Sequence, residues 1–508
     1  MSTRNIPFIL ILAAIALTAC DDDLTYAELR EREKNQIEAF IKNGCCVTDD
    51  KNGFYVKGEE YFIVGKEGLK NFRDWVNAEE GRVFQATIGS NLETVRLVCE
   101  GKTFHLVADV DLENEDWTPI ADKENWRYFA GVFDGNCKSV INMHIPTTMY
   151  ASEYIAFMSA LGDPSGAASA AELKNLTVYG DVTGKNAAGV IARVDGGLVS
   201  NVVGHVTVTG DATGAKIGGI SVLAQLGARY VDVRNYGVLS SPTASGAEKP
   251  TAGIVAYVNY QASFVRCANY GEISSKSTVG GLVGLLTACP KEHVYEWEVP
   301  FVSCTNAAKI SVVDWHAGGL IGKAKAVSVE NKFRSKVRFS DCANLAQVVS
   351  EQKQSGSYFG AFVGAQQQNE DEIVIEDCAT ALAGQRFSGE NVAVGLSVRA
   401  TITNGDIVRF YPSISGAIAA TKAGDVVVLE ANSSESFELP LGVTFKQNGK
   451  AYTGTISAPA GYFASYDSVK DEWTCRPAVA QIGTKIYSSL AEAYAETVDG
   501  DTIKILSD

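Results

Sequence analysis

The middle of the chain repeats one short pattern, seen most clearly as Gly280-Gly281-Leu282-Val283-Gly284. Two small residues, an apolar pair and a further small residue recur at intervals of 28 to 42 residues. Repeats of this length are typical of solenoids, in which each repeat is one supersecondary unit that stacks on its neighbours. The other copies, some of them approximate, occupy residues 188–192, 218–222, 252–256, 318–322 and 360–364.

A second pattern lies between these copies and contains cysteine, alanine and asparagine in a row, followed two residues later by glycine. Its clearest copy runs from Phe264 to Ile273, with Cys267, Asn269 and Gly271. Asparagine and glycine accept the left-handed backbone of tight turns, so each repeat divides into two or three strands of about 4–6 residues. Stacking such coils about 4.8 Å apart lets each strand bond to its equivalents above and below.

We therefore predict an all-β fold, a right-handed parallel β-helix (solenoid) with an N-terminal helix, a capping helix and a small α+β repeat tail. A β-propeller is the main alternative, but its blades take about 40–45 residues and four strands. Equivalent side chains of stacked coils form ladders. We expect an amide ladder at one corner that contains Asn175, Asn201, Asn235, Asn269, Asn306 and Asn344.

An inward column of thiols is predicted beside this ladder. A metal site and a disulfide between coils are the alternatives to simple packing. We expect no metal, because the ligands would come from different coils in an apolar interior. The column contains Cys267, Cys304, Cys342 and Cys378.

A helix is predicted at the start of the repeats. Leu69, Phe72, Trp75 and Val76 share one helical face over residues 68–77. The first coil of a β-helix exposes strand edges and an apolar core. We therefore expect this helix to cover that end.

Two further segments contain helices. One helix of about 17 residues should run from a capping box at 25–28 to Gly44, with an apolar stripe for docking or for a partner. In the tail, residues 411–429 and 487–505 repeat each other at an offset of 76, each as a short helix, a Gly-Asp turn and a strand. The second copy has no downstream coils, so either the product is shorter than its relatives or the last strand pairs back onto the first unit.

The first twenty residues have the features of a lipoprotein signal. Arg4 precedes an apolar run at 8–17 that is too short to span a bilayer. Leu17 to Cys20 resemble a lipobox, which predicts acylation of Cys20 and attachment to outer-membrane lipid. Asp residues at 21–23 resemble the surface-export signal of Bacteroides-type lipoproteins and predict a protein that faces the cell exterior, with a solvated tether as the alternative.

The predicted organisation has four parts. The signal peptide is predicted at residues 1–19, and an acidic tether and amphipathic helix follow at 20–60. The β-helix is predicted at 61–385. Residues 386–508 should form a C-terminal module of helix-strand repeats, complete or incomplete. Lys and Arg number 44 against 60 Asp and Glu, a net charge of −16. We expect no nucleic-acid partner for a chain of this charge.

The order of the motifs resembles a known family. After the capping helix come Ala-Asp-Val-Asp-Leu at 108–112, Trp-Thr-Pro-Ile at 117–120 and Phe-Ala-Gly-Val-Phe-Asp-Gly-Asn at 129–136, followed by the glycine repeats. Over residues 61–385 this order resembles bacterial surface proteins with GLUG-motif repeats. The resemblance implies a cell-surface, adhesin-like protein. Cys137 departs from the pattern, because a small polar residue or histidine is commoner there.

Carboxylates in the first coils are the candidates for catalysis. Asp109, Asp111 and Asp134 could hold Ca²⁺, abstract a sugar proton or flank a glycosidic bond. Strand alternation puts Asp109 and Asp111 on the solvent side, and Asp134 opens an Asp-Gly turn. The same acids belong to the structural signature of the family that the chain resembles. No triad order, metalloprotease motif, P-loop or dinucleotide fingerprint occurs, so we predict no catalytic site, cofactor or metal.

Insertions in the last three coils give the candidate binding site. Loops at 288–299, 324–337 and 365–372 should emerge along one edge, whereas Trp315 and His316 lie in a different turn. An aromatic loop beside a basic loop suits an acidic glycan, and tolerated surface insertion is the alternative. The candidate residues are Tyr295 and Trp297 from the first loop and Lys332, Arg334, Lys336 and Arg338 from the second.

Together these features predict a cell-surface lipoprotein that displays a β-helix and binds a glycan or host ligand. Two other classes stay open, a polysaccharide lyase or hydrolase on the same fold and a structural surface spacer. Binding without cleavage would favour the first class, and cleavage would favour the second.

Overall fold

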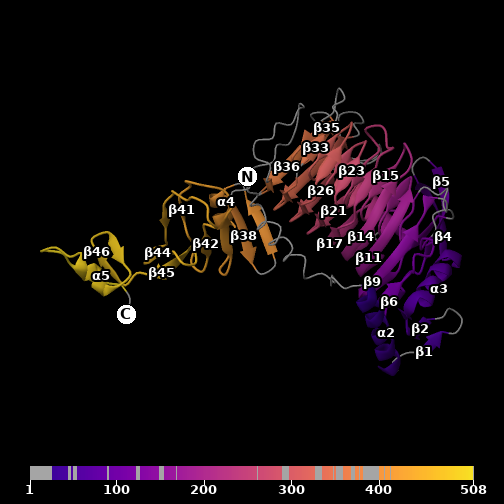
Figure 1. Cartoon of the computed structure of the whole chain (residues 1–508), viewed down its shortest axis with the longest axis horizontal. Coiled ribbons are helices and arrows are strands. Elements are labelled where there is room, and N and C mark those ends of the chain that lie inside the picture. The colour runs from indigo at the N-terminus through magenta and orange to yellow at the C-terminus, as the bar shows by residue number, and fades with distance from the viewer. Residues whose placement is uncertain are drawn as a thin grey trace.

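A computed structural model gives the fold of the chain. Figure 1 shows a stack of coils that runs from α2 and β1 to β35 and β36, with the tail beyond. The structure describes residues 26–43, 47–49, 54–88, 91–121, 126–147, 154–166, 169–259, 261–288, 297–326, 335–346, 348–350, 359–367, 372–376, 378–380, 400–404, 407–411 and 413–506.

Three long sheets run along the stack, and each coil adds strands to them. Apart from β1–β3 and β4–β5 at the start, which are antiparallel, neighbouring strands are parallel. In the described residues the first sheet has ten strands. They are β4 (Arg82–Ile88), β5 (Asn91–Val98), β8 (Arg127–Phe129), β10 (Met158–Gly162), β13 (Ile191–Asp195), β16 (Ser221–Gln225), β20 (Val255–Asn259), β25 (Val283–Ala288), β30 (Ile321–Ala326) and β35 (Val363–Gln367).

The other two sheets complete each coil. The described part of the second sheet is β12 (Asn186–Ala188), β15 (Lys216–Gly218), β19 (Thr251–Ala252), β24 (Val279–Gly280), β29 (Ala317–Gly318) and β34 (Phe359–Gly360). The third sheet comprises β1 (Val47–Asp49), β2 (Phe54–Lys57), β3 (Glu60–Ile63), β6 (Thr103–Leu106), β7 (Val110–Asp111), β9 (Val132–Ile145), β11 (Glu172–Gly184), β14 (Leu198–Gly210), β17 (Ala228–Asn235), β18 (Leu239–Ser241), β21 (Ala262–Val265), β22 (Ala268–Asn269), β23 (Ile273–Ser275), β26 (Trp297–Val302), β27 (Thr305–Asn306), β28 (Ile310–Val312), β31 (Ser335–Ser340), β32 (Ala343–Asn344), β33 (Val348–Ser350), β36 (Glu372–Glu376) and β37 (Ala379–Thr380). The predicted all-β parallel solenoid is confirmed.

Aromatic rings stack in the interior of the coils. Neighbouring rings have centroids 5.2, 4.7 and 5.1 Å apart and interplanar angles of 13°, 7° and 30°. Their side chains are fully buried, so apolar burial and ring stacking both stabilise the contacts between coils. The stack contains Tyr230, Phe264, Phe301 and Phe339.

The thiol column also lies in the interior, as predicted. Cys267, Cys304, Cys342 and Cys378 are fully buried free thiols. The backbone N–H groups of Cys304 and Cys342 each donate to the sulfur of the next coil, at 3.4 and 3.3 Å. Cys137, outside the column, is disulfide-bonded.

The predicted single amide ladder is wrong, because the six asparagines belong to two ladders. Asn201 and Asn175 occupy a left-handed corner, with φ of 50° and 53°. Strand register pairs Gly204, not Asn201, with Asn235. The buried ladder starts at Asn235, and its amide Nδ2 atoms donate to the next Oδ1 at 2.8, 2.9 and 3.0 Å. It contains Asn235, Asn269, Asn306 and Asn344, all fully buried.

The glycine pattern leaves room for this buried ladder. A Cβ added at Gly253 would lie 2.3 Å from Asn269 Cγ and 2.3 Å from the Gly281 carbonyl oxygen. A Cβ at Gly319 would lie 2.3 Å from Asn344 Cγ. These contacts are too close for any side chain, so the glycine and asparagine repeats specify each other.

Two helices pack at the N-terminal end of the stack, and the one predicted to cover this end lies where it was expected. Helix α3 (Gly65–Ala78) buries Leu69, Phe72 and Val76, and the Phe72 ring packs 4.6 Å from Phe104. Helix α2 (Tyr26–Asn43) packs the Phe40 ring 5.3 Å from Tyr55 and 5.6 Å from Phe62. Part of its apolar stripe is thus a docking face.

The tail contains two related units. The first comprises β38 (Ala400–Asn404), β39 (Ile407–Tyr411), α4 (Ile414–Ala419) and β40 (Val426–Leu429), followed by β41 (Phe437–Glu438), β42 (Thr444–Lys446), β43 (Ile456–Ser457), β44 (Tyr462–Asp467) and β45 (Glu472–Pro477). The second comprises β46 (Ala480–Ile482), β47 (Lys485–Tyr487), α5 (Leu490–Ala495) and β48 (Ile503–Ile505). In both units the strand after the helix pairs antiparallel with the first strand of its own unit. The idea that the last strand pairs back onto the first unit is therefore wrong.

Candidate binding surface

The three predicted loops begin and end at one corner of the solenoid. The strands that precede them, β25, β30 and β35, are paired in register, and so are β26, β31 and β36, which follow them. Residues 289–296, 327–334 and 368–371 lie outside the described residues. Tyr295, Lys332 and Arg334 are therefore not placed, and neither is the lipidation residue Cys20.

Of the other predicted binding residues, Arg338 is engaged by an acid. Its Nε donates to Glu298 Oε1 at 2.8 Å, with both side chains partly exposed. Lys336 lies in register between Glu298 and Glu372, and Trp297 pairs with Ser335. Acidic residues thus lie next to the basic ones at the base of the predicted loops. The basic composition of the second loop alone did not predict these neighbouring acids.

A stack of aromatic rings on the outer face of the third sheet was not predicted. Its centroids are 4.5, 4.8 and 4.8 Å apart, with interplanar angles of 8°, 6° and 15°. The side chains are half-buried. We call this set the outer ladder. It contains Tyr179, His205, Tyr236 and Tyr270.

The sequence does contain a signal for the outer ladder. Tyr236 and Tyr270 each follow a buried asparagine and precede a glycine. His205 follows Gly204, which occupies the asparagine position of its own coil. Aligning the variable position of the second repeat pattern would have revealed the stack.

A positive charge and an acid–histidine pair border the outer ladder. Arg234 lies beside Tyr270: burial raises the pKa of that phenol, and the charge of Arg234 opposes the increase. Among the described residues, the buried Nη1 of Arg234 has no hydrogen-bond partner. His144 Nδ1 lies 2.7 Å from Asp181 Oδ2, and Asp181 is two residues beyond Tyr179 on the same strand. The ring edges of the outer ladder thus lie close to ionic groups.

The prediction that Asp109 and Asp111 face solvent is wrong. Their exposed fractions are 1% and 6%. Asp109 accepts hydrogen bonds from Arg32 Nε at 2.6 Å, Arg32 Nη2 at 2.9 Å and the Ser139 N–H at 2.7 Å. Strand alternation alone could not show this, because helix α2 supplies Arg32 from a distant part of the sequence.

Asp111 and Asp134 likewise support the backbone. Asp111 Oδ1 accepts from the Glu113 N–H and from Asn142 Nδ2, both at 2.7 Å. Asp134 Oδ1 accepts from the Asn136 N–H at 2.8 Å, which confirms its predicted turn, and from Asn175 Nδ2 at 2.9 Å. Through these hydrogen bonds, both carboxylates stabilise the backbone of the first coils.

Trp315 and His316 lie between β28 and β29, away from the loop corner, as predicted. Their rings form an edge contact with centroids 6.1 Å apart. Burial, together with the charge of Lys323, lowers the pKa of His316 to about 4. This histidine is therefore neutral at physiological pH.

The described residues contain neither a candidate metal cluster nor a candidate membrane-spanning helix. No group of three or more His, Cys, Asp or Glu in the described parts of the chain could hold a metal ion. Among the helices in those same parts, none is long and apolar enough to cross a bilayer.

Comparisons with known proteins yield one structural likeness. No family model matches the chain, and no curated protein matches it. A solved structure described as a "putative immunoglobulin A1 protease" from Bacteroides ovatus has 14% identity and a TM-score of 0.39. The alignment covers 70% of this chain and 93% of that one. A similarity of this size supports no functional argument.

Proposed function

We propose that the protein is a surface lipoprotein whose right-handed β-helix, similar to that of GLUG-repeat proteins, binds a glycan or host ligand in the manner of an adhesin. The lipid anchor would be Cys20, and the chain would face the cell exterior. The outer ladder carries the proposal, because it is a continuous surface of half-buried aromatic groups across four coils.

The location part of the proposal draws on two observations. The lipobox ends at Cys20 and is followed by acidic residues at 21–23. Cys137 is disulfide-bonded. Disulfides persist mainly outside the reducing cytoplasm, so the disulfide agrees with export.

The binding part of the proposal follows from the chemistry of the outer ladder. Each ring face in the middle of the stack is covered by the next ring, and the Tyr236 hydroxyl is buried. The ring edges are therefore what the stack offers to a ligand. Tyrosine and histidine combine an apolar body with a hydrogen-bonding group. Arg234 adds a guanidinium group, which favours carboxylate or sulfate groups on the ligand. An acidic glycan lying across the coils would meet both kinds of group.

The enzymatic alternative has less support than binding. The three carboxylates that suggested it are hydrogen-bonded to the backbone or to side chains that shape the first coils. A structural spacer is the class that remains if no ligand binds.

A glycan-array screen of the full chain, paired with a depolymerisation assay, tests the proposal. We expect binding without cleavage, and Tyr236→Ala or Arg234→Ala should weaken it about tenfold, equivalent to about 1.4 kcal/mol. Val469→Ala is the matched control, because Val469 is 94% exposed in the tail.

Loop deletions separate the outer ladder from the predicted loops. Removing only 289–296 and 327–334 spares the strands on either side. Binding that survives these deletions but not Tyr236→Ala would locate the site on the outer ladder, and the reverse would locate it in the loops. Surface proteolysis of intact cells tests exposure, and full protection would exclude an adhesin.

A further inference from the structure

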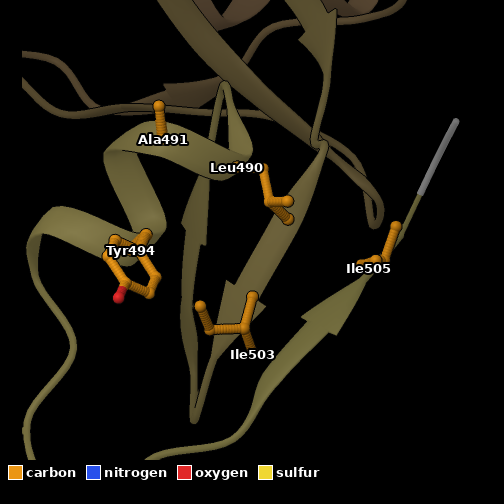
Figure 2. A pocket seen from close by; sticks show the side chains of 5 residues that line it. All are labelled: Leu490, Ala491, Tyr494, Ile503 and Ile505. Carbon is orange, nitrogen blue, oxygen red and sulfur yellow. The ribbon is translucent and has the colours of Figure 1, made fainter.

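The last unit of the chain leaves an apolar groove open between its helix and its last strand. The groove has a volume of about 570 Å³ and is lined by Leu490, Ala491, Tyr494, Ile503 and Ile505. Figure 2 shows these side chains on α5 and β48. Leu490 is 46% exposed, Tyr494 75% and Ile505 61%, which is unusual for large apolar residues at one place.

The first tail unit shows how the same positions look when they are covered. At the offset of 76 residues, Leu490 corresponds to Ile414, and Ile505 corresponds to Leu429. Both Ile414 and Leu429 are 0% exposed. The segment that follows β40 shares their apolar cluster through Phe437, Leu439, Val443 and Phe445.

The backbone of the two units differs in the same way. In the first unit β40 pairs with β38 on one edge and in parallel with β42 on the other. In the described chain β48 pairs only with β46. A strand edge with unpaired N–H and C=O groups beside apolar side chains is suited to strand addition.

Charge indicates what kind of strand fits. Residues 478–506 contain two Lys and four Asp or Glu, a net charge of −2. Two copies of the chain meeting through this groove would bring the same acidic residues together, which disfavours a second copy. A strand with basic residues on its outward positions would complement the charge.

We propose that this groove accepts a β-strand from another polypeptide. The incoming strand runs parallel to β48, as β42 does to β40. Its alternate apolar side chains cover Leu490, Tyr494 and Ile505, and basic residues flank them. The incoming strand would then cover the apolar groove of the second unit, as β42 and its neighbouring residues cover the same positions of the first unit.

The probe is a labelled synthetic peptide of residues 433–447, the chain's own covering segment, added to the full chain. Fluorescence anisotropy measures binding, and hydrogen exchange measures protection of the amides at 502–506. We expect binding, slower exchange at these amides, and tighter binding of a second peptide that carries Glu435→Lys and Glu438→Lys. A peptide with Val443→Asp and Phe445→Asp should not bind.

Variants of the full chain decide whether the groove is responsible. Ile505→Asp should weaken binding at least about tenfold, whereas Val469→Asp, at an exposed apolar site on the β44–β45 hairpin, should have no effect. Equal binding by both variants would overturn the proposal, as would failure of both native and basic peptides to bind. Concentration-dependent dimerisation that Ile505→Asp abolishes would assign the groove to a second copy instead.

Discussion

Replacing Asn269 with alanine should destabilise the solenoid by about 4 kcal/mol. Its Nδ2 donates to Asn306 Oδ1 at 2.9 Å and to the Gly271 carbonyl at 3.1 Å, and its Oδ1 accepts from Asn235 Nδ2 at 2.8 Å. Asn235 keeps its bond to the Gly237 carbonyl. The buried Asn306 Oδ1 and Gly271 carbonyl oxygen would each lose a hydrogen-bond donor, and each loss costs about 1–2 kcal/mol. The cavity left by the missing side-chain atoms adds about 1 kcal/mol.

Urea unfolding followed by circular dichroism measures this cost. Asn259→Ala is the matched control, because Asn259 donates at 3.1 Å to Gln225 at a less buried site and should cost only about 1 kcal/mol. A loss for Asn269→Ala no larger than for Asn259→Ala would refute the reasoning that the buried ladder holds the coils together.

An aspartate at position 269 gives a further test with a defined pH dependence. Asn269→Asp would place a carboxylate oxygen against Asn306 Oδ1, so the folded state should favour the protonated acid and raise its pKa. Stability should therefore be greatest below about pH 4, the unfolded pKa, and should fall as the pH rises above it. A variant as stable at pH 7 as at pH 4 would contradict the assigned amide orientation.

Two further perturbations have defined outcomes. Arg32→Ala leaves the buried Asp109 with its bond from the Ser139 N–H but without its ionic partner, and it should cost about 2–3 kcal/mol. Hydrogen exchange in α2 should become faster, and unchanged exchange would argue against docking through this pair. The pKa of His316 is lowered to about 4 in the folded state. As the pH falls below about 6.5, His316 therefore becomes protonated in the unfolded chain while it is still neutral in the folded protein. The free energy of unfolding should then drop by up to about 3 kcal/mol between pH 6.5 and pH 4. Urea unfolding of the parent and of His316→Gln at both pH values measures this drop, and the variant should lack the contribution of His316.

The repeating part of the fold was predictable because its signals are local. Glycines at the pattern positions and the regular return of Cys267, Cys304 and Cys342 indicate stacked coils without any knowledge of distant contacts. The capping helix was predictable for the same reason, since Leu69 and Phe72 fall on one helical face. Periodicity within a short segment is enough for both features.

The register between coils was harder to predict from the sequence. Asn201 and Asn235 look equivalent in sequence, but Asn201 sits at a left-handed corner while Asn235 points inward beside Gly219. Both roles suit asparagine, one through its backbone preference and the other through its amide. Only strand pairing separates them.

Long-range docking explains the other differences. Asp109 has the alternation of an exposed residue, yet Arg32 reaches it from 77 positions earlier. The outer ladder requires four coils in register before its rings can meet. Of the residues predicted to bind a ligand, Arg338 is the one with a described side-chain contact, and that contact is with an acid.

The head-to-tail order of the buried amides makes one coil interchangeable with the next. Asn269 and Asn306 each donate to the coil that follows and accept from the coil before, and the bonds of the ladder span 34, 37 and 38 residues. A whole coil inserted or lost therefore restores the same donor and acceptor on both sides, whereas a break inside a coil sets a glycine against the wrong side chain. Recombination between repeats can change the length of such a protein in steps of about 4.8 Å without altering either end.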